Sequence, residues 1–207
     1  MTSYENVTDY NGGLSLMPNS LMKTFALKGN LLYTRNPSRF ESFTDHYLVC
    51  ENGRVAGVFD SLPARYAGIT VDDTGGALIV PGMTDLHVHA PQYAFRGLGM
   101  DTELLDWLRA YTFPEEARYG DMVYAEKAYR QFVNDLKHST ATRACIFSTI
   151  HPDTTLLLMQ MLEETGLVTK VGKVNMDVNS PDDYVEATSD SLATTDAWIR
   201  KSQSAFR

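Results

Sequence analysis

The sequence predicts an α/β protein in which a small sheet-forming region precedes a series of parallel βα units. Between residues 22 and 59 the apolar runs are short and strand-like. From residue 80 onward, strand-like runs alternate three times with amphipathic helical segments. Strand, helix, strand, helix, strand, helix is the order of parallel βα units. A closed (β/α)8 barrel takes about 250 residues and eight units, so the three units between Val80 and Arg207 are less than half of the eight.

The composition is that of an ordinary globular protein and excludes several classes of partner. Of the 207 residues, 43% are hydrophobic and 21% charged. A formal net charge of -8 argues against nucleic acid or an anionic membrane, since a basic patch normally meets such partners. Cys50 and Cys145 are too few for a disulfide scaffold, and neither a signal-peptide pattern nor a run of about 18 apolar residues is present. We therefore expect a cytoplasmic protein without a membrane span.

The N-terminal third divides into an arm and a sheet. Residues 1–20 are polar and rich in Gly and Asn, which predicts a flexible N-terminal arm. Residues 21–80 form the small sheet domain, with strand-like runs at 25–27, 31–33, 47–50 and 55–59. Asn52-Gly53 lies between the last two runs and predicts a hairpin, because both residues tolerate positive φ. We expect a small antiparallel sheet, followed by a turn over residues 72–76.

The α/β region is expected over residues 81–207. Asp101 can cap a helix over residues 102–111. Asp121 can cap a longer helix, which runs toward Lys137 and His138. This second helix carries an apolar stripe formed by Met122, Ala125, Tyr129, Phe132, Val133 and Leu136.

The next two βα units follow the same pattern. A strand over residues 142–150 leads to a helix capped by Asp153 or Thr154, which ends before Gly166. Residues 167–177 supply the third strand. A final helix starts at about residue 188, and its apolar side is expected to carry Leu192, Trp198 and Ile199.

The most informative motif is His87-Val88-His89, at the end of the first strand of this region. Side chains alternate between the two faces of a strand, so both imidazoles project to one side and can bind one metal ion together. Asp85 shares that side and could hold the ligands in place by hydrogen bonding. A catalytic zinc usually has three or more protein ligands, and this stretch supplies two.

Longer segments around this motif resemble a known enzyme family. The run from Pro81 through His87-Val88-His89 resembles the first-strand metal motif of the amidohydrolase superfamily. Its continuation Ala90-Pro91-Gln92-Tyr93 resembles the guanine deaminases in particular. So do the segments at 104–108, 111–116, 140–151, 171–177 and 186–192. The resemblance runs from about residue 25 to the end of the chain.

The resemblance implies a zinc hydrolase that converts guanine and water to xanthine and ammonia in purine catabolism. Such an enzyme is a (β/α)8 barrel with a small β-sandwich built from both chain ends, so this chain would hold part of the sandwich and the first three βα units. His87 and His89 match the first two zinc ligands. The segment His89, Ala90, Pro91 and Gln92 matches the part that contacts the purine, and Gln92 matches a residue that holds the base.

The family's other functional groups lie on later strands. The remaining zinc ligands, a His and an Asp, belong there together with the catalytic Glu and a further His. No catalytic residue is therefore assigned within these 207 residues. The resemblance also implies guanine as the small-molecule substrate and a homodimer as the state of the full-length enzyme. In this chemistry zinc lowers the pKa of its bound water to about 7, and a carboxylate carries the proton to the departing ammonia. Gln92 offers both a donor and an acceptor, which suits the mixed edge of guanine.

Several other residues allow two interpretations. His151 ends the second strand, where barrel enzymes gather function, but it could also be hydrogen-bonded in the following turn. Asn175 and Asp177 share a strand face and could reach the same site or shape a turn. The aromatic residues within 107–113 could line a purine pocket or serve only for packing.

Two alternative functions remain open at this stage. One is another deaminase or a chlorohydrolase of the same superfamily. Gln92 discriminates between this alternative and a guanine deaminase, because an enzyme that does not bind a purine has less need of an amide at this position. The other is a catalytically inactive, truncated or split chain that acts only through a partner. The missing ligands and the open sheet edge motivate this second alternative.

Overall fold

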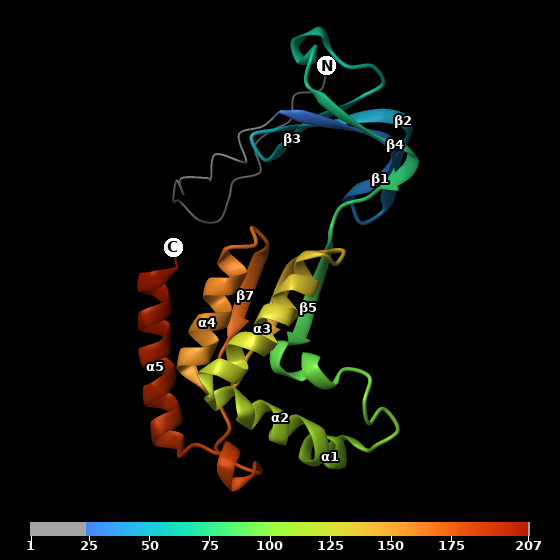
Figure 1. Cartoon of the computed structure of the whole chain (residues 1–207). Coiled ribbons are helices and arrows are strands. Elements are labelled where there is room, and N and C mark those ends of the chain that lie inside the picture. Colours follow the sequence, from blue (N-terminus) through green and yellow to red (C-terminus); the bar gives the residue numbers. More distant parts are fainter. Residues whose placement is uncertain (1–23, 207) are drawn as a thin grey trace. The chain divides into compact units, whose positions relative to one another are not determined.

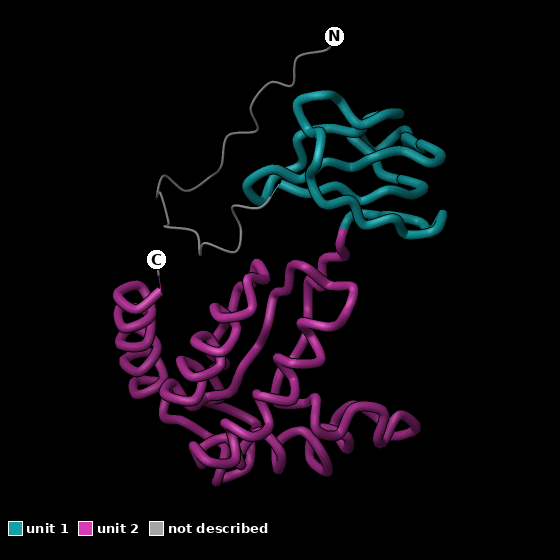
Figure 2. The backbone as a smooth tube through the Cα atoms, turned by 45° about the horizontal axis from the view of Figure 1, so that its top comes forward, with its two compact units in different colours: residues 1–81 teal, residues 82–207 magenta. Residues whose placement is uncertain are grey.

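The computed structural model describes residues 24–206, and the arm expected over residues 1–20 lies outside the described residues. Figure 2 shows that the chain divides into two compact units. Unit 1 ends at Pro81, and unit 2 is Gly82–Arg207. None of the described helices is long and apolar enough to cross a membrane.

Unit 1 contains a four-stranded sheet in the order β3-β2-β1-β4 (Figure 1). Its strands are β1 (Phe25–Asn36), β2 (Arg39–Glu51), β3 (Arg54–Phe59) and β4 (Thr70–Ile79), with a 3-10 turn at Ala64–Tyr66. The hairpin predicted at Asn52 and Gly53 is confirmed, because these residues adopt positive φ values of 52° and 75°. Glu51 and Arg54 pair directly across it.

The antiparallel sheet predicted between residues 22 and 59 is confirmed, because β1 pairs with β2 and β2 with β3 in antiparallel fashion. The addition of β4 makes the sheet mixed. β1 and β4 run parallel. The expected turn over residues 72–76 lies inside β4, where Gly75 and Gly76 adopt positive φ. The register with β1 shifts here, between Lys28 and Asn30. The two glycines therefore bend the strand without ending it, as in a β-bulge.

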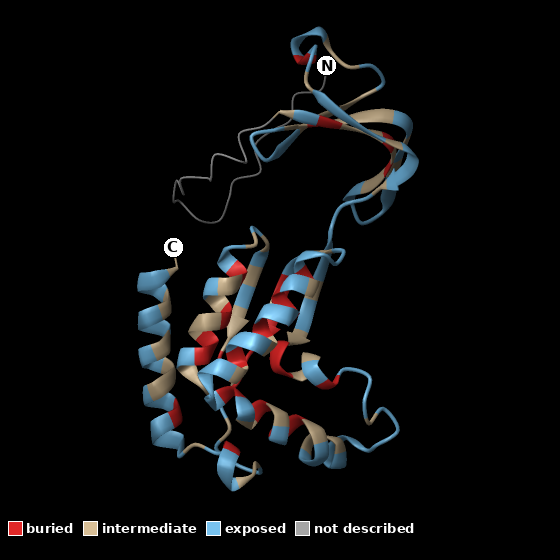
Figure 3. Ribbon diagram, viewed as in Figure 1, coloured by how far each residue is buried: buried red, intermediate tan, exposed pale blue. Residues whose placement is uncertain are grey.

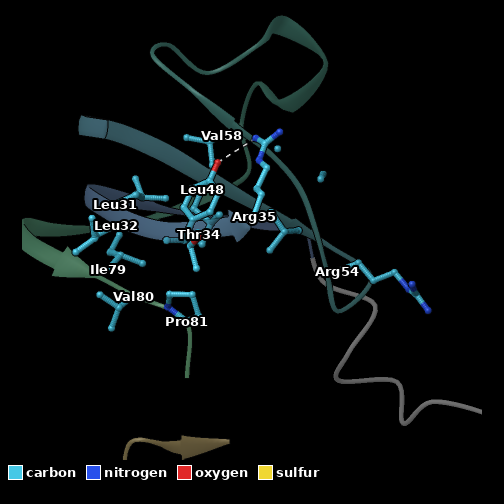
Figure 4. A pocket seen from close by; sticks show the side chains of 14 residues that line it. Leu31, Leu32, Thr34, Arg35, Leu48, Arg54, Val58, Ile79, Val80 and Pro81 are labelled. Atoms are coloured by element: carbon cyan, nitrogen blue, oxygen red, sulfur yellow. Dashed lines mark hydrogen bonds between the residues drawn. The ribbon is translucent and has the colours of Figure 1, made fainter. Parts of the chain in front are cut away.

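The two faces of this sheet differ. The core lies on one face and is centred on Ala26, Val49 and Tyr66. Alternation along β2 places Leu48 on the other face. That face lines an apolar cavity of about 670 Å³, to which Leu31, Val58 and Ile79 also contribute (Figure 4).

Unit 2 is an α/β unit around a three-stranded parallel sheet in the order β5-β6-β7. Its strands are β5 (Met83–His89), β6 (Ala141–Phe147) and β7 (Val168–Gly172). Its α-helices are α1 (Leu104–Trp107), α2 (Phe113–Ala117), α3 (Met122–Lys137), α4 (Pro152–Glu163) and α5 (Thr188–Ala205). Shorter helical turns lie at Ala90–Phe95, Leu108–Thr112, Arg118–Gly120 and Asp182–Tyr184. The predicted βα order is confirmed, whereas closure into a barrel stays a prediction.

The central helix α3 forms as its sequence predicts. The Asp121 carboxylate accepts hydrogen bonds from the backbone N–H groups of Val123 at 2.8 Å and Tyr124 at 3.3 Å, which caps the helix. The predicted apolar stripe is buried except for Met122. Figure 3 shows buried positions gathered where α3 and α4 meet the sheet. These two helices and the sheet thus make the core of unit 2.

Three helix details differ from the sequence prediction. Glu103, and not Asp101, precedes α1, which continues into α2 through a π-helical turn. His151 is the N-cap residue of α4, because Pro152 occupies the first helical position, where no backbone N–H is needed. The expected apolar side of α5 is largely exposed. Leu192 and Ile199 face solvent, and the helix instead buries the small Ser191.

Candidate active site

His87 and His89 lie together at the carboxyl end of β5. Their ring centroids are 5.0 Å apart, as alternation along a strand predicts. The register of β5 against β6 shifts between Asp85 and Val88, in the stretch of β5 that contains His87. Asp85 Oδ1 accepts a hydrogen bond from the backbone N–H of His87 at 3.1 Å. Asp85 therefore fixes the backbone that carries His87, and this bond does not involve either imidazole ring.

Phe147, the last residue of β6, lies against both imidazoles. Its ring centroid is 4.7 Å from that of His87 and 4.9 Å from that of His89. The interplanar angle with His89 is 19°, so these two rings are stacked. Burial lowers the pKa of His89, and the neighbouring His87 lowers it further. The neutral imidazole, which is the form that binds metal ions, is therefore favoured at His89.

A buried carboxyl group lies beside His89. Glu116 belongs to α2, and only 4% of its surface is exposed. Its Oε1 accepts a hydrogen bond from Gln92 Nε2 at 3.0 Å, and its Oε2 accepts one from the Tyr184 hydroxyl at 2.7 Å. Burial raises the pKa of Glu116, and the two hydrogen bonds act in the opposite direction. Nδ1 of His89 lies 3.9 Å from Oε1, which is beyond hydrogen-bond distance.

Glu116 has no role predicted from the sequence. It belongs to one of the segments that resemble the guanine deaminases, but no spacing rule links it to Gln92, which lies 24 positions earlier. The turn at Ala90–Phe95 and helix α2 meet only in the folded chain. No local signal in the sequence could therefore have revealed this contact.

The predicted purine-contacting segment starts at His89 and continues into the 3-10 turn Ala90–Phe95. Within it the side chains of Ala90 and Pro91 are buried, and the carbonyl oxygen of Pro91 accepts a hydrogen bond from the Tyr119 hydroxyl at 3.3 Å. Gln92 is half-buried. Its amide nitrogen and the imidazole of His89 both lie close to the same oxygen of Glu116, Oε1. Contact between Ala90 or Pro91 and a ligand stays a prediction. Because both side chains are buried, such a contact would be made mainly by backbone atoms.

His151 occupies a different environment from the histidine pair. Its ring lies against Tyr184, with centroids 6.2 Å apart, and against Gly120, where an added Cβ would be 3.1 Å from the ring. Its Nε2 is buried and has no hydrogen-bond partner among the described residues. Burial lowers the pKa of His151. These contacts favour a packing role at the start of α4.

Asn175 and Asp177 serve to attach α5. Asn175 Oδ1 accepts hydrogen bonds from Ser191 Oγ at 3.1 Å and Thr195 Oγ1 at 2.8 Å. Asp177 Oδ2 accepts one from Thr188 Oγ1 at 2.9 Å. The structural interpretation of both residues is therefore the better supported one.

The aromatic residues within 107–113 also serve for packing. Phe113 is buried in a cluster with Ile150 and Tyr184. Trp107 and Tyr111 both lie against the ring of Phe95, with centroid distances of 5.5 and 6.2 Å.

The histidine pair fits two of the ligands of a zinc ion. Nδ1 of His89 is buried and has no hydrogen-bond partner among the described residues. Neutral imidazole nitrogens are common zinc ligands. Within the described part of the chain, no group of three or more His, Cys, Asp or Glu side chains could hold a metal ion. The pair is therefore suited to zinc as a partial ligand set.

Proteins with similar sequences are guanine deaminases. The chain is 39% identical over 130 residues to the guanine deaminase of Dictyostelium discoideum, and 42% identical over 121 residues to that of Rattus norvegicus. These matches cover 63% and 58% of this chain but only 29% and 27% of the relatives. The chain thus spans less than a third of the length of these curated relatives. No protein-family profile matches it.

Solved structures show the same likeness. The crystal structure of guanine deaminase from C. acetobutylicum with guanine bound in the active site has a TM-score of 0.80 and 43% sequence identity, covering 86% of this chain and 43% of that one. An atrazine chlorohydrolase from Arthrobacter aurescens, complexed with zinc and atraton, has a TM-score of 0.65 over 86% of this chain and 43% of its own. At 13% identity it shows a shared fold alone. The predicted resemblance to guanine deaminases is confirmed.

Proposed function

We propose that this chain is the N-terminal part of a zinc-dependent guanine deaminase, which hydrolyses guanine to xanthine and ammonia. The carrying observation is the similarity to the guanine-bound deaminase structure, at a TM-score of 0.80 and 43% identity. In this proposal the three βα units of unit 2 begin a (β/α)8 barrel, and unit 1 is part of a β-sandwich. The complete enzyme is a cytoplasmic homodimer of purine catabolism.

The residues at the end of β5 have distinct proposed roles. His87 and His89 are two of the zinc ligands, and Gln92 holds the purine. Bound zinc would supply a hydroxide at neutral pH for attack on the carbon that bears the amino group. Asp85 fixes the backbone of His87, and Phe147 packs against both imidazole rings. The other ligands and the catalytic carboxylate come from later strands of the complete enzyme.

Each unit has a surface that further strands of a longer protein could cover, which supports the proposal that the chain is part of a larger enzyme. β5 is an outer strand of its sheet, so one of its edges has no partner among the described strands. The cavity of unit 1 lies on the sheet face opposite the core, and Figure 4 shows aliphatic side chains in its lining, with Arg35 and Arg54 also contributing. Further strands of a barrel and of a sandwich would cover both surfaces, and we therefore propose that the 207-residue chain alone is inactive.

The test uses the full-length protein from the same locus, purified with zinc. It should release ammonia from guanine and form xanthine. His89→Ala should lower both the zinc content and kcat/KM. The loss in kcat/KM should exceed the roughly hundredfold that loss of an outer hydrogen-bond partner can cost. His138→Ala is the matched control, because this exposed residue lies at the end of α3 and its ring bonds the backbone of Asn134.

Each outcome of this test decides one point. A wild-type enzyme that ignores guanine but hydrolyses another substrate would overturn the substrate assignment. Unchanged zinc content in His89→Ala would overturn the ligand assignment.

A further inference from the structure

We propose that Glu116 is a positioning residue, which fixes the orientation of the Gln92 amide and thereby determines what that amide offers to a purine. This inference rests on the proposed function. It assigns a specificity role to a side chain that does not itself contact the ligand. Glu116 is buried, and its two carboxyl oxygens accept hydrogen bonds from Gln92 and Tyr184.

The amide of glutamine is nearly symmetric in shape but not in hydrogen bonding. Its oxygen accepts, whereas its nitrogen donates, so a rotation of 180° about the last bond exchanges the two. The ionised Glu116 carboxylate, which the hydrogen bonds from Tyr184 and Gln92 favour, can only accept, and its Oε1 lies 3.0 Å from Gln92 Nε2. A rotated Gln92 would place two acceptor oxygens against each other. Glu116 therefore holds the nitrogen of Gln92 toward itself and leaves the amide oxygen for another partner.

Glu116 is itself held firmly. Its second carboxyl oxygen accepts the hydroxyl proton of Tyr184, which is fully buried, at 2.7 Å. Tyr184 also packs against Phe113, which begins α2, with ring centroids 6.2 Å apart. Glu116 is thus anchored through Oε2 to a buried tyrosine, and its Oε1 is left to bond Gln92. Such support from residues behind a binding group is what keeps that group in one geometry.

The chemical consequence concerns the ligand. With its nitrogen engaged by Glu116, Gln92 presents its amide oxygen as an acceptor, together with the remaining N–H. An acceptor oxygen selects a ligand edge that carries N–H donors. Guanine has such donors at its ring N–H and its amino group, and the product xanthine retains ring N–H donors. Loss of Glu116 would let the amide rotate and weaken this selection.

The experiment is a double-mutant cycle in the full-length zinc enzyme. Glu116→Met removes both acceptors at nearly constant size, and Gln92→Met removes the amide. Glu116→Met should raise the KM for guanine and the inhibition constant of xanthine about tenfold, the size expected for one lost hydrogen bond, while zinc content stays unchanged. In the Gln92→Met background, Glu116→Met should change the KM by less than about twofold, because there is no amide left to orient.

Two further variants complete the design. Glu116→Gln keeps one acceptor and should give an intermediate KM, and it also serves if Glu116→Met fails to fold. Glu115→Met is the matched control. Glu115 is the preceding residue in α2, and it bonds Arg118 and Tyr124 instead of Gln92. This control should leave the KM unchanged.

The outcomes separate the inference from the proposed function. Coupling between Glu116 and Gln92 supports the inference. Additive effects on KM in an active enzyme would overturn it, because a merely structural carboxyl group acts independently of the amide. A folded, zinc-loaded wild-type enzyme without activity on guanine would overturn the proposed function, and the inference with it.

Discussion

The two outer strands of the parallel sheet in unit 2 end in opposite ways. After β7, the side chain of Lys173 is fully buried, and its Nζ donates to Asn175 Oδ1 at 2.9 Å and to the Glu186 carboxylate at 3.1 and 3.2 Å. At the end of β5, His87 is exposed, and Nδ1 of His89 is buried without a partner among the described residues. Buried polar groups that are satisfied within the protein stabilise it, whereas an unsatisfied nitrogen beside the exposed His87 is available to a ligand that enters there. The β7 end therefore serves structure, and the β5 end is suited to binding.

The largest effect is expected at the β7 end. Lys173→Met should lower the free energy of unfolding by about 3–5 kcal/mol, because it leaves the Glu186 carboxylate largely buried and unpaired. Urea unfolding of the full-length protein measures this. Lys201→Met is the matched control, since the ion pair of Lys201 with Asp153 is exposed and should contribute at most about 1 kcal/mol. Equal effects of the two substitutions would remove the structural role assigned to the β7 end.

A smaller, pH-dependent effect is expected at His151, beside the charges of Lys173 and Glu186. Burial lowers the pKa of His151 below its ordinary value of 6.5, so the folded state binds fewer protons than the unfolded chain near that pH. Stability should therefore fall as the pH is lowered from above 6.5 through the lowered pKa. Urea unfolding at several pH values should show a shallower dependence in His151→Phe. A slope identical to that of the wild type would contradict this assignment.

The smallest effect on stability is expected at the β5 end. His87→Ala should change the free energy of unfolding of the zinc-free protein by less than about 1 kcal/mol, because His87 is exposed. The same substitution should abolish most of the rise in Tm that zinc gives the wild type, because an ion that binds only the folded state stabilises it. Thermal unfolding with and without zinc measures both quantities. A large loss of stability without zinc would remove the contrast between the two strand ends.

Local signals in the sequence predicted much of the fold. Asn52-Gly53 predicted a hairpin from the φ preferences of two residues, and Asp121 predicted a cap from one side chain. The parallel pairing of β4 with β1 could not be predicted in this way, because it depends on residues more than 40 positions apart. The glycines at 75 and 76 predict a turn and a bulge equally well, because glycine adopts the positive φ that both require.

The candidate site was predicted only in its local half. Alternation along one strand was enough to bring His87 and His89 together. Phe147 and Glu116 come from other elements, so their contacts with His89 follow from the pairing of β5 with β6 and from the position of α2. Residue spacing predicts which side chains are neighbours along one helix or strand. It cannot predict these contacts, because they join residues of different elements.

The stacking of Phe147 on His89 has a consequence for the entropy of binding. A side chain that is free to change rotamer loses that freedom when it binds an ion or ligand, and the loss weakens the affinity. Here the aromatic contact, at 4.9 Å between centroids, restricts the imidazole before any ligand arrives. Part of the ordering cost of a bound ion would therefore be met during folding, and β6 would raise the affinity of the proposed site through packing.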